Sequence, residues 1–268
     1  SNKKTTATFQ LDELIFKDST ENNPLKLSME NLNFLFDIHN DSILFDFAWD
    51  DNIISDRNKG DIDAFYVMND NNEGKLNISS FDVIINDTTW HMTHNGYIDF
   101  KNDKTIINDI DFYTQKQSLK IDGYYPKTSA DTLYISFHDF NISNVDVITT
   151  PKGLNFDGVI NGDLQMSGIS DKFTFLSNLD ILNIGINNHI VGDAVIDANW
   201  NAPDTSIYID THINRKNNNE KLLALNGNYY TSRNDNNIDF DVLLRDIDVS
   251  IIKPFTKKIL SDVKGKIN

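Results

Sequence analysis

Apolar and polar residues alternate one by one along most of this chain. Leu133, Ile135 and Phe137, for example, alternate with Tyr134 and Ser136. Because successive side chains of a β-strand point to opposite faces of the sheet, this period predicts strands with one apolar and one polar face. Further apolar rows of the same kind are Ile196, Ala198 and Trp200, then Ile207 and Ile209, then Leu223 and Leu225, and finally Phe240, Val242 and Leu244.

Turn-forming residues separate these rows. Clusters of Asn, Asp and Gly occupy residues 70–74, 94–96, 161–163 and 234–237. Asn and Asp tolerate positive φ angles or bond to their own backbone, and Gly adopts positive φ at no steric cost, so such clusters favour turns. Short alternating strands at this spacing predict a mostly β protein with an antiparallel sheet.

One segment departs from the alternation. Between residues 251 and 260 the apolar residues Ile252, Phe255 and Ile259 are spaced as on one side of a helix. Pro254 is compatible only with the first turn of a helix. We therefore expect a short helix at 251–260.

The chain nearly repeats one passage. Residues 133–161 and 240–268 align without a gap at an offset of 107 positions, so that Asp139 matches Asp246 and Gly158 matches Gly265. Repetition at this scale predicts stacked units that extend one sheet, since a single unit cannot bury its own apolar face. We divide the chain into a cloning remnant (1–2), a first β repeat block (3–150) and a second block (151–268) that ends as the next module begins.

The alternation slips by one residue at the same place in both copies. The row that ends at Phe137 resumes at Phe140, and the row that ends at Leu244 resumes at Ile247. One extra residue in a strand is typical of a β-bulge, which restores the apolar side chains to their original face. We expect bulges or bends at 138–139 and 245–246.

The order of features between residues 89 and 168 resembles a known family. It comprises a strand with Trp (89–92), a hairpin strand (96–100), a strand from Gln117 to Gly123, and a glycine-rich strand from Gly158 to Gly168. This order resembles the central repeat region of the TamB family (translocation and assembly module, AsmA-like superfamily) in the form found in Bacteroidetes-like bacteria. The resemblance covers most of residues 75–268.

The resemblance implies an architecture and a function. The architecture is an elongated antiparallel repeat sheet folded over an apolar interior, a β-taco with a groove. The function is non-enzymatic: a periplasmic conduit and scaffold for phospholipid transport and for outer-membrane protein assembly. The family's inner-membrane anchor and the domain that meets its outer-membrane barrel partner are expected in regions outside this sequence.

The apolar rows are the candidate functional site. An open groove lined by such rows would bind phospholipid acyl chains without a charged clamp, because each buried methylene contributes about 0.8 kcal/mol. The same rows would also form an ordinary closed core, and the alternation fits both interpretations. The candidate groove residues are Leu133, Ile135, Phe137, Ile196, Ala198, Trp200, Ile207, Ile209, Leu223, Leu225, Phe240, Val242 and Leu244.

The composition of the chain disfavours several classes of partner and function. The net charge of −16 disfavours nucleic acid as a partner, since binding phosphates requires Lys and Arg. The chain has no Cys, which excludes disulfides and zinc–thiolate sites, and it carries no phosphate-binding loop or nucleophile motif. We therefore expect no enzyme, no metal and no cofactor. The second hypothesis is a secreted or surface β-sandwich module that binds a glycan or acts as an adhesin.

Overall fold

The computed structural model describes most of the chain. The described residues are 4–16, 27–50, 58–69, 71, 73–85, 87–93, 96–149, 155–169, 173–187, 189–201, 203–215, 220–233, 235–245, 247–248 and 266–267. They divide into two compact units, unit 1 up to Tyr125 and unit 2 from Pro126. The boundary of the sequence repeat blocks, after residue 150, marks the end of a repeated passage and is a different kind of division.

The predicted mostly β, antiparallel fold is confirmed. The strands of unit 1 are β1 (Lys4–Phe16), β2 (Leu27–His39), β3 (Ser42–Asp50), β4 (Asn58–Met68), β5 (Gly74–Ile85), β6 (Thr88–Met92), β7 (Tyr97–Phe100), β8 (Thr105–Tyr113) and β9 (Ser118–Tyr124). Those of unit 2 are β10 (Thr132–Asn141), β11 (Phe156–Ser167), β12 (Thr174–Ile186), β13 (His189–Asn201), β14 (Ser206–Asn214), β15 (Lys221–Tyr230), β16 (Ile238–Leu244), β17 (Ile247–Asp248) and β18 (Lys266–Ile267).

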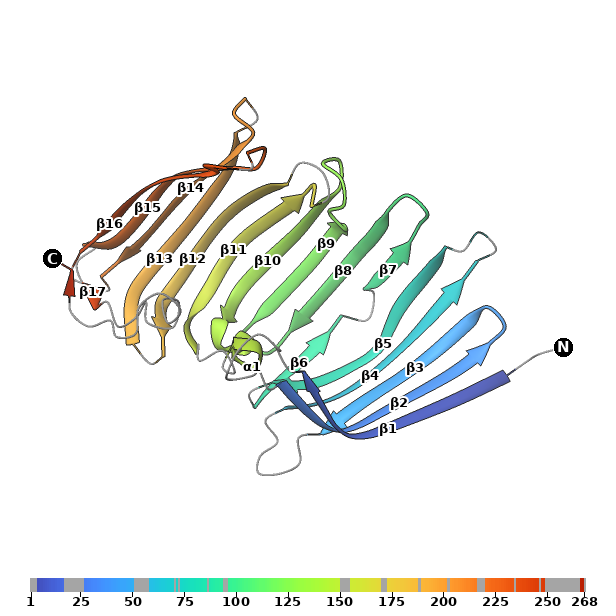
Figure 1. Ribbon diagram of the computed structural model, residues 1–268. Coiled ribbons are helices and arrows are strands. Elements are labelled where there is room, and N and C mark those ends of the chain that lie inside the picture. The colour runs from blue at the N-terminus through green and yellow to red at the C-terminus, as the bar shows by residue number, and fades with distance from the viewer. Residues whose placement is uncertain are drawn as a thin grey trace. The chain divides into compact units, whose positions relative to one another are not determined.

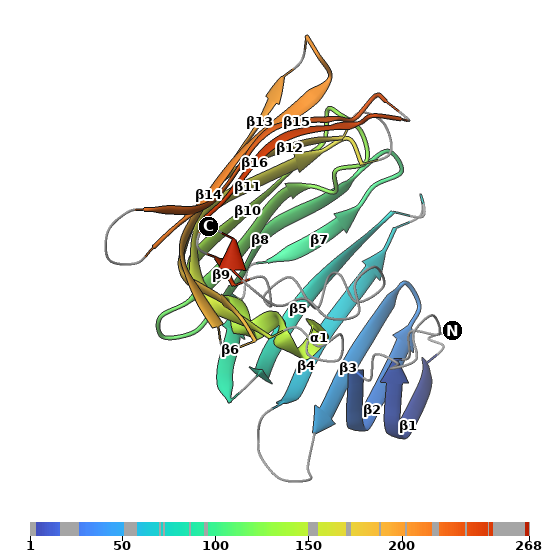
Figure 2. The same ribbon diagram turned by 60° about the vertical axis from the view of Figure 1, so that its left-hand side comes forward.

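Each unit is an extended antiparallel sheet whose strands follow chain order. In unit 1 the order runs from β1 to β9, with β6 and β7 both lying between β5 and β8. Both views show β1 to β4 side by side in this order (Figures 1 and 2). In unit 2, β10 to β16 are neighbours in sequence order, and β17 pairs with β18. Sequential pairing means that each strand adds its apolar residues to the same face as the strand before it.

The sequence repeat is also a structural repeat. In the first copy Phe140 pairs with Ile160, one step beyond the irregular site. In the second copy Ile247 pairs with Ile267, which are the same two positions shifted by 107. The two copies therefore share backbone register where both are described.

The predicted bulge in the first copy is present. His138 and Asp139 together lie opposite Asn161, and Asp139 adopts a φ of 45°. The Asp139 N–H donates to the Asn161 side-chain oxygen at 2.8 Å, which holds the extra residue in place. The rings of Phe137 and Phe140 lie 5.6 Å apart, so the bulge does keep both on one side. In the second copy β16 ends at Leu244 and β17 begins at Ile247, with Asp246 outside the described residues.

A short helical segment follows β10. It consists of a 3-10 turn (Ile142–Val145) and α1 (Asp146–Thr149), and the Asn141 side chain caps its start by accepting from the Ser143 N–H at 3.1 Å. The Asp146 carboxylate accepts from the Phe156 N–H at 2.8 Å and so ties the segment to β11. The helix expected at 251–260 lies outside the described residues. Its counterpart in the first copy, 144–153, overlaps the helical segment that is seen.

Buried side chains lie mainly on one face of each sheet. In unit 1 they include Leu32, which is 1 % exposed, and Trp90, which is 4 % exposed. The cross-strand registers place the buried residues of unit 1 on the same side. In unit 2 Leu222 and Ala224 are buried on the opposite face from Leu223, a feature that alternation alone did not predict.

Candidate functional site

The thirteen predicted groove residues share one face of the unit 2 sheet. In an antiparallel sheet directly paired residues point to the same face. Ala198 pairs with Ile209, Ile209 with Gly227, and Gly227 with Phe240, which links four successive strands. The remaining registers extend the same face back to Leu133 on β10. The structure thus brings together all the residues that the alternation selected.

These residues differ in exposure. Leu133, Ala198 and Ile207 are buried, at 9 %, 1 % and 3 % exposure. Val242, on the outer strand, is 58 % exposed, and the other nine are half-buried. A closed core would bury most large apolar side chains completely. The face is therefore apolar throughout but covered only in part.

Small residues interrupt the larger ones on this face. The row of cross-strand pairs through Ile209 contains Ser177, Ala198 and Gly227. A Cβ added to Gly227, which has a φ of 153°, would meet the backbone oxygen of Asp239 on β16. This glycine is thus required for close approach of two strands.

Unit 1 carries a second apolar face, built from aromatic rings, which the sequence analysis missed. Phe34 and Phe47 stack with ring centroids 4.5 Å apart, and Phe47 stacks on Trp49 at 5.1 Å. Phe36 meets Phe45 edge-on at 5.5 Å. The alternation of Phe34 with Phe36, and of Phe45 with Phe47, is the signal that would have identified this face.

A glycine seats one of these rings. Trp49 pairs with Gly60 on the next strand, and its indole lies directly over that residue. A Cβ at Gly60 would lie 2.0 Å from the ring, so any other residue would displace it. Tyr66 covers Gly74 in the same manner. Two rings of the aromatic face therefore need a glycine beneath them.

The opposite face of unit 1 is acidic. Carboxylate oxygens of Asp46, Asp61 and Asp63 lie within 4.8 Å of one another, an arrangement of oxygen ligands that a cation can share. Partial desolvation raises the pKa of the Asp61 carboxyl above its ordinary value, and the charges of Asp46, Asp63 and Asp82 raise it further. Burial and the neighbouring carboxylates therefore both disfavour the charged form of Asp61, while Asp82 lies 3.6 Å from the His91 imidazole.

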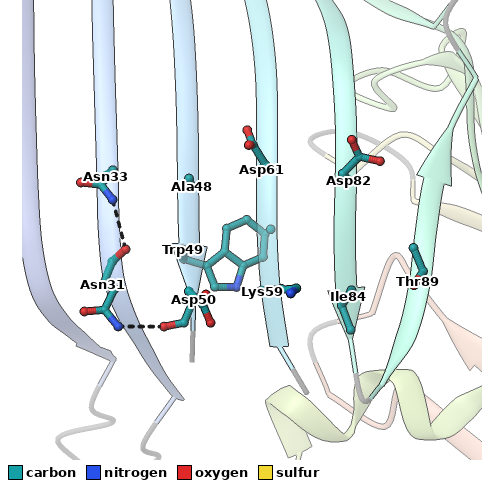
Figure 3. Close-up of a pocket in the computed structure, with 11 residues that line it drawn as sticks. Asn31, Asn33, Ala48, Trp49, Asp50, Lys59, Asp61, Asp82, Ile84 and Thr89 are labelled. Carbon is teal, nitrogen blue, oxygen red and sulfur yellow. Dashed lines mark hydrogen bonds between the residues drawn. The ribbon is translucent and has the colours of Figure 1, made fainter. Parts of the chain in front are cut away.

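An open hollow of about 420 Å³ lies beside this acidic cluster (Figure 3). Asn31 donates from its side chain to the Asp50 carbonyl at 3.1 Å, and Asn33 donates to the Asn31 carbonyl at 3.5 Å. Both bonds hold side chains of β2 against the backbone of β2 and β3. The lining residues are Asn31, Asn33, Ala48, Trp49, Asp50, Lys59, Gly60, Asp61, Asp82, Ile84 and Thr89.

The other face of unit 2 is mainly polar, apart from residues such as Leu222 and Ala224, and carries hydrogen bonds between strands. The Ser136 hydroxyl donates to the Asp163 carboxylate at 2.6 Å, and Asn226 donates to the Asp210 carboxylate. In the registers Asp163, Asn178 and Asp197 continue the same polar row. Both units therefore have one apolar face and one mainly polar face that carries Asp residues.

The chain matches no protein-family model, no curated protein and no solved structure. Among the described residues, no helix is long and apolar enough to cross a membrane. The functional conclusion therefore rests on the geometry of the two faces.

Proposed function

We propose that this chain is part of a non-enzymatic conduit that carries phospholipid acyl chains along its apolar sheet faces in the bacterial envelope. The observation that supports this best is the continuity of one apolar face across β10 to β16 in unit 2, with large side chains left partly exposed. The aromatic face of unit 1 adds a second surface of the same polarity. The resemblance to the TamB family points in the same direction.

The energetics of the unit 2 face suit an acyl chain. Each methylene removed from water on such a surface contributes about 0.8 kcal/mol, so a lipid tail binds by length rather than by a particular contact. Such a surface lets a chain slide, since no single position is preferred. The carboxylates on the opposite faces repel anionic headgroups, which favours the apolar faces as the surface for lipid.

In the proposed role the apolar faces line a groove that opens along one edge, and the protein works in the periplasm. The inner-membrane anchor and the outer-membrane barrel partner belong to this proposal through the family resemblance alone. The chain itself supplies the surface for hydrocarbon, and the proposed role in outer-membrane protein assembly follows from the same resemblance.

Lipid extraction tests this function. We expect organic extraction of the purified protein, followed by mass spectrometry, to recover phospholipid at a defined ratio to protein. Ile209→Asp should reduce that ratio, because a carboxylate on the face has to be desolvated beside hydrocarbon. Asp210→Asn, on the opposite face, is the matched control and should leave the ratio unchanged. Recovery of no phospholipid, or equal recovery from both variants, would refute the proposal.

A further inference from the structure

The outermost strand of unit 2, β16, has one open edge. In the described part of the chain it pairs with β15 alone, and Figure 1 shows it at the margin of the unit 2 strands. The Asn237 carbonyl accepts from the Tyr230 N–H, and the Arg245 N–H donates to the Leu222 carbonyl, both at 2.8 Å. Backbone groups alternate between the two sides of a strand, so the odd-numbered residues of β16 bond to β15. The even-numbered residues direct their N–H and C=O groups toward the open edge.

This edge lacks several features that normally protect a free strand, although it carries two charged residues, Asp239 and Asp241. Exposed edges are usually blocked by Lys, Pro, a bulge or a very short strand. β16 has seven residues without Lys or Pro, and it pairs with β15 in unbroken register. Ile238 is 61 % exposed and Val242 is 58 % exposed. Such an edge is suited to pairing with another strand.

The first copy of the repeat shows which kind of strand fits. Residues 133–137 of β10 correspond to 240–244 of β16, and they pair with 162–166 of β11. The second copy reproduces the next step of this pairing, since Ile247 and Ile267 take the places of Phe140 and Ile160. The pairing of β17 with β18, which follows β16 along the chain, therefore uses the same register as the pairing of β10 with β11.

We propose that the open edge of β16 binds an extended strand with the residue pattern of β11, antiparallel and in the β10–β11 register. A glycine then lies opposite Leu244, and apolar side chains lie opposite Val242 and Phe240, as Gly162, Leu164 and Met166 do in the first copy. The added strand places its apolar side chains on the face already described for unit 2. This inference concerns backbone pairing and holds whether or not the face binds lipid.

A second copy of this chain is a poorer partner. Its own β11 is paired on both sides, with β10 and β12, and so is not free to be donated. A copy would have to offer one of its own outer strands, β1 or β16, and both lack a glycine for the position opposite Leu244. Self-association through one of these outer strands is therefore the competing outcome of the experiment.

Peptide binding tests the proposal on the unaltered protein. A fluorescently labelled synthetic peptide with the sequence of residues 162–168 is titrated with the protein, and anisotropy is measured. The peptide begins at residue 162 because the places of residues 159 and 160 are already taken by β18, which pairs with β17. We expect saturable binding that is lost when the peptide carries an N-methyl group at Leu164, whose N–H would face Val242. Because the Gln165 N–H would point away from β16, methylation there should leave binding within about twofold, whereas loss of the paired hydrogen bonds at 164 should weaken it about tenfold or more.

A substitution in β16 tests the same hydrogen bonds from the side of the protein. Val242→Pro removes an N–H that faces the open edge and leaves the bonds to β15 intact, a position where an edge strand tolerates proline. We expect this variant to bind the peptide about tenfold more weakly or worse. Absence of binding by the wild-type protein, or binding that neither the Leu164 methyl group nor the proline weakens, would overturn the proposal. Concentration-dependent self-association that the peptide does not displace would overturn it in favour of pairing between outer strands of two copies.

Disulfide crosslinking between the protein and the peptide tests the proposed register. In the proposed pairing Asp241 lies opposite Gln165 of the peptide, as Tyr134 does in the first copy. The two residues form a non-hydrogen-bonded pair, whose Cα separation of about 4.5 Å is suitable for a disulfide. The protein has no native cysteine, so Asp241→Cys should crosslink selectively to a Gln165→Cys peptide and not to a Ser167→Cys peptide. Equal crosslinking to both peptides would contradict the stated register.

Discussion

The apolar faces of the two units are built from different side chains. In unit 1 the rings of Phe34, Phe47 and Trp49 stack on one another, and the indole covers a glycine. In unit 2 aliphatic side chains predominate, with small residues such as Ala198 between them. What the units share is that each directs most of its apolar residues to one face of its own sheet.

Because the two faces differ in composition, their stability should depend on different kinds of contact. Stacked rings gain stability from pairwise contacts at particular distances, so unit 1 depends on ring geometry. An aliphatic face gains stability from the area that it buries, so unit 2 depends on the few residues that are wholly enclosed. The two units should therefore respond differently to substitutions of the same size.

The largest effect is expected from Ala198→Asp in unit 2. Ala198 is 1 % exposed between Ser177 and Ile209, so a carboxylate there would be buried without a partner. We expect the free energy of unfolding to fall by about 3–5 kcal/mol in chemical denaturation. Asn199→Asp, on the exposed opposite face, is the control and should change it by less than about 0.5 kcal/mol. Equal stability of both variants would mean that the apolar face is open to water at Ala198.

Phe47→Leu in unit 1 tests the role of ring stacking. The substitution keeps an apolar side chain but removes two ring contacts, to Phe34 at 4.5 Å and to Trp49 at 5.1 Å. We expect a loss of about 1–2 kcal/mol in the free energy of unfolding. Ile209→Leu in unit 2, which conserves volume on the aliphatic face, should cost less than about 1 kcal/mol. If the two changes cost the same, the aromatic contacts add nothing beyond buried area.

Each unit has a β-bulge at which a side chain of the next strand accepts a hydrogen bond from the backbone of the extra residue, and loss of that side chain should destabilise both units. In unit 2 Asn161 accepts from the Asp139 N–H at 2.8 Å, and in unit 1 the Asp122 carboxylate accepts from the Asp109 N–H at 2.9 Å. The Asn161 amide also donates to the Asp139 carboxylate at 3.1 Å. Asp122→Ala should lower the free energy of unfolding by about 1 kcal/mol, the net value of a typical hydrogen bond, and Asn161→Ala by about 1–2 kcal/mol. Thermal melting of each variant measures this. A loss in only one unit would show that the other bulge is held by its neighbours instead.

The smallest effect is expected from Asp61→Asn on the acidic face of unit 1. The pKa of Asp61 is raised above 3.8, so the folded state binds this proton more tightly than the unfolded state does. Stability from this group is therefore present below pH 3.8 and falls as the pH rises through the higher folded-state pKa. Asp61→Asn should raise the free energy of unfolding by about 0.5 kcal/mol at pH 7, after allowance for solvent screening, and leave it unchanged at pH 3.

The matched change in unit 2 should have the opposite sign. Asp163 accepts a hydrogen bond from the Ser136 hydroxyl at 2.6 Å, so Asp163→Asn weakens a charge-assisted bond. Denaturation of both variants at pH 7 compares them. Stabilisation by both substitutions would show that general charge repulsion, rather than the local cluster at Asp61, determines the result.

Much of the fold was predictable from alternation. The period-two rows predicted strands and the shared face of the thirteen residues, because register in a one-sided sheet follows the apolar pattern. The slip between Phe137 and Phe140 predicted a real bulge for the same reason.

Other features depend on contacts that no local pattern records. The seating of Trp49 on Gly60 requires the pairing of β3 with β4, which sequence alone did not define. Burial of Leu222 and Ala224 on the polar side likewise depends on tertiary neighbours. The acidic cluster of unit 1 could not be predicted, because Asp46 comes close to Asp61 only through the pairing of β3 with β4.

Site-specific photocrosslinking in cells tests the central claim most directly. A photoreactive amino acid is placed at Ile209, on the apolar face, or at Tyr208, its 40 % exposed neighbour on the opposite face. If the apolar face carries phospholipid, irradiation should attach phospholipid to the protein at 209 and not at 208, as detected by mass spectrometry of the purified adduct. Crosslinks only to protein at 209, or equal lipid labelling at both positions, would contradict the account.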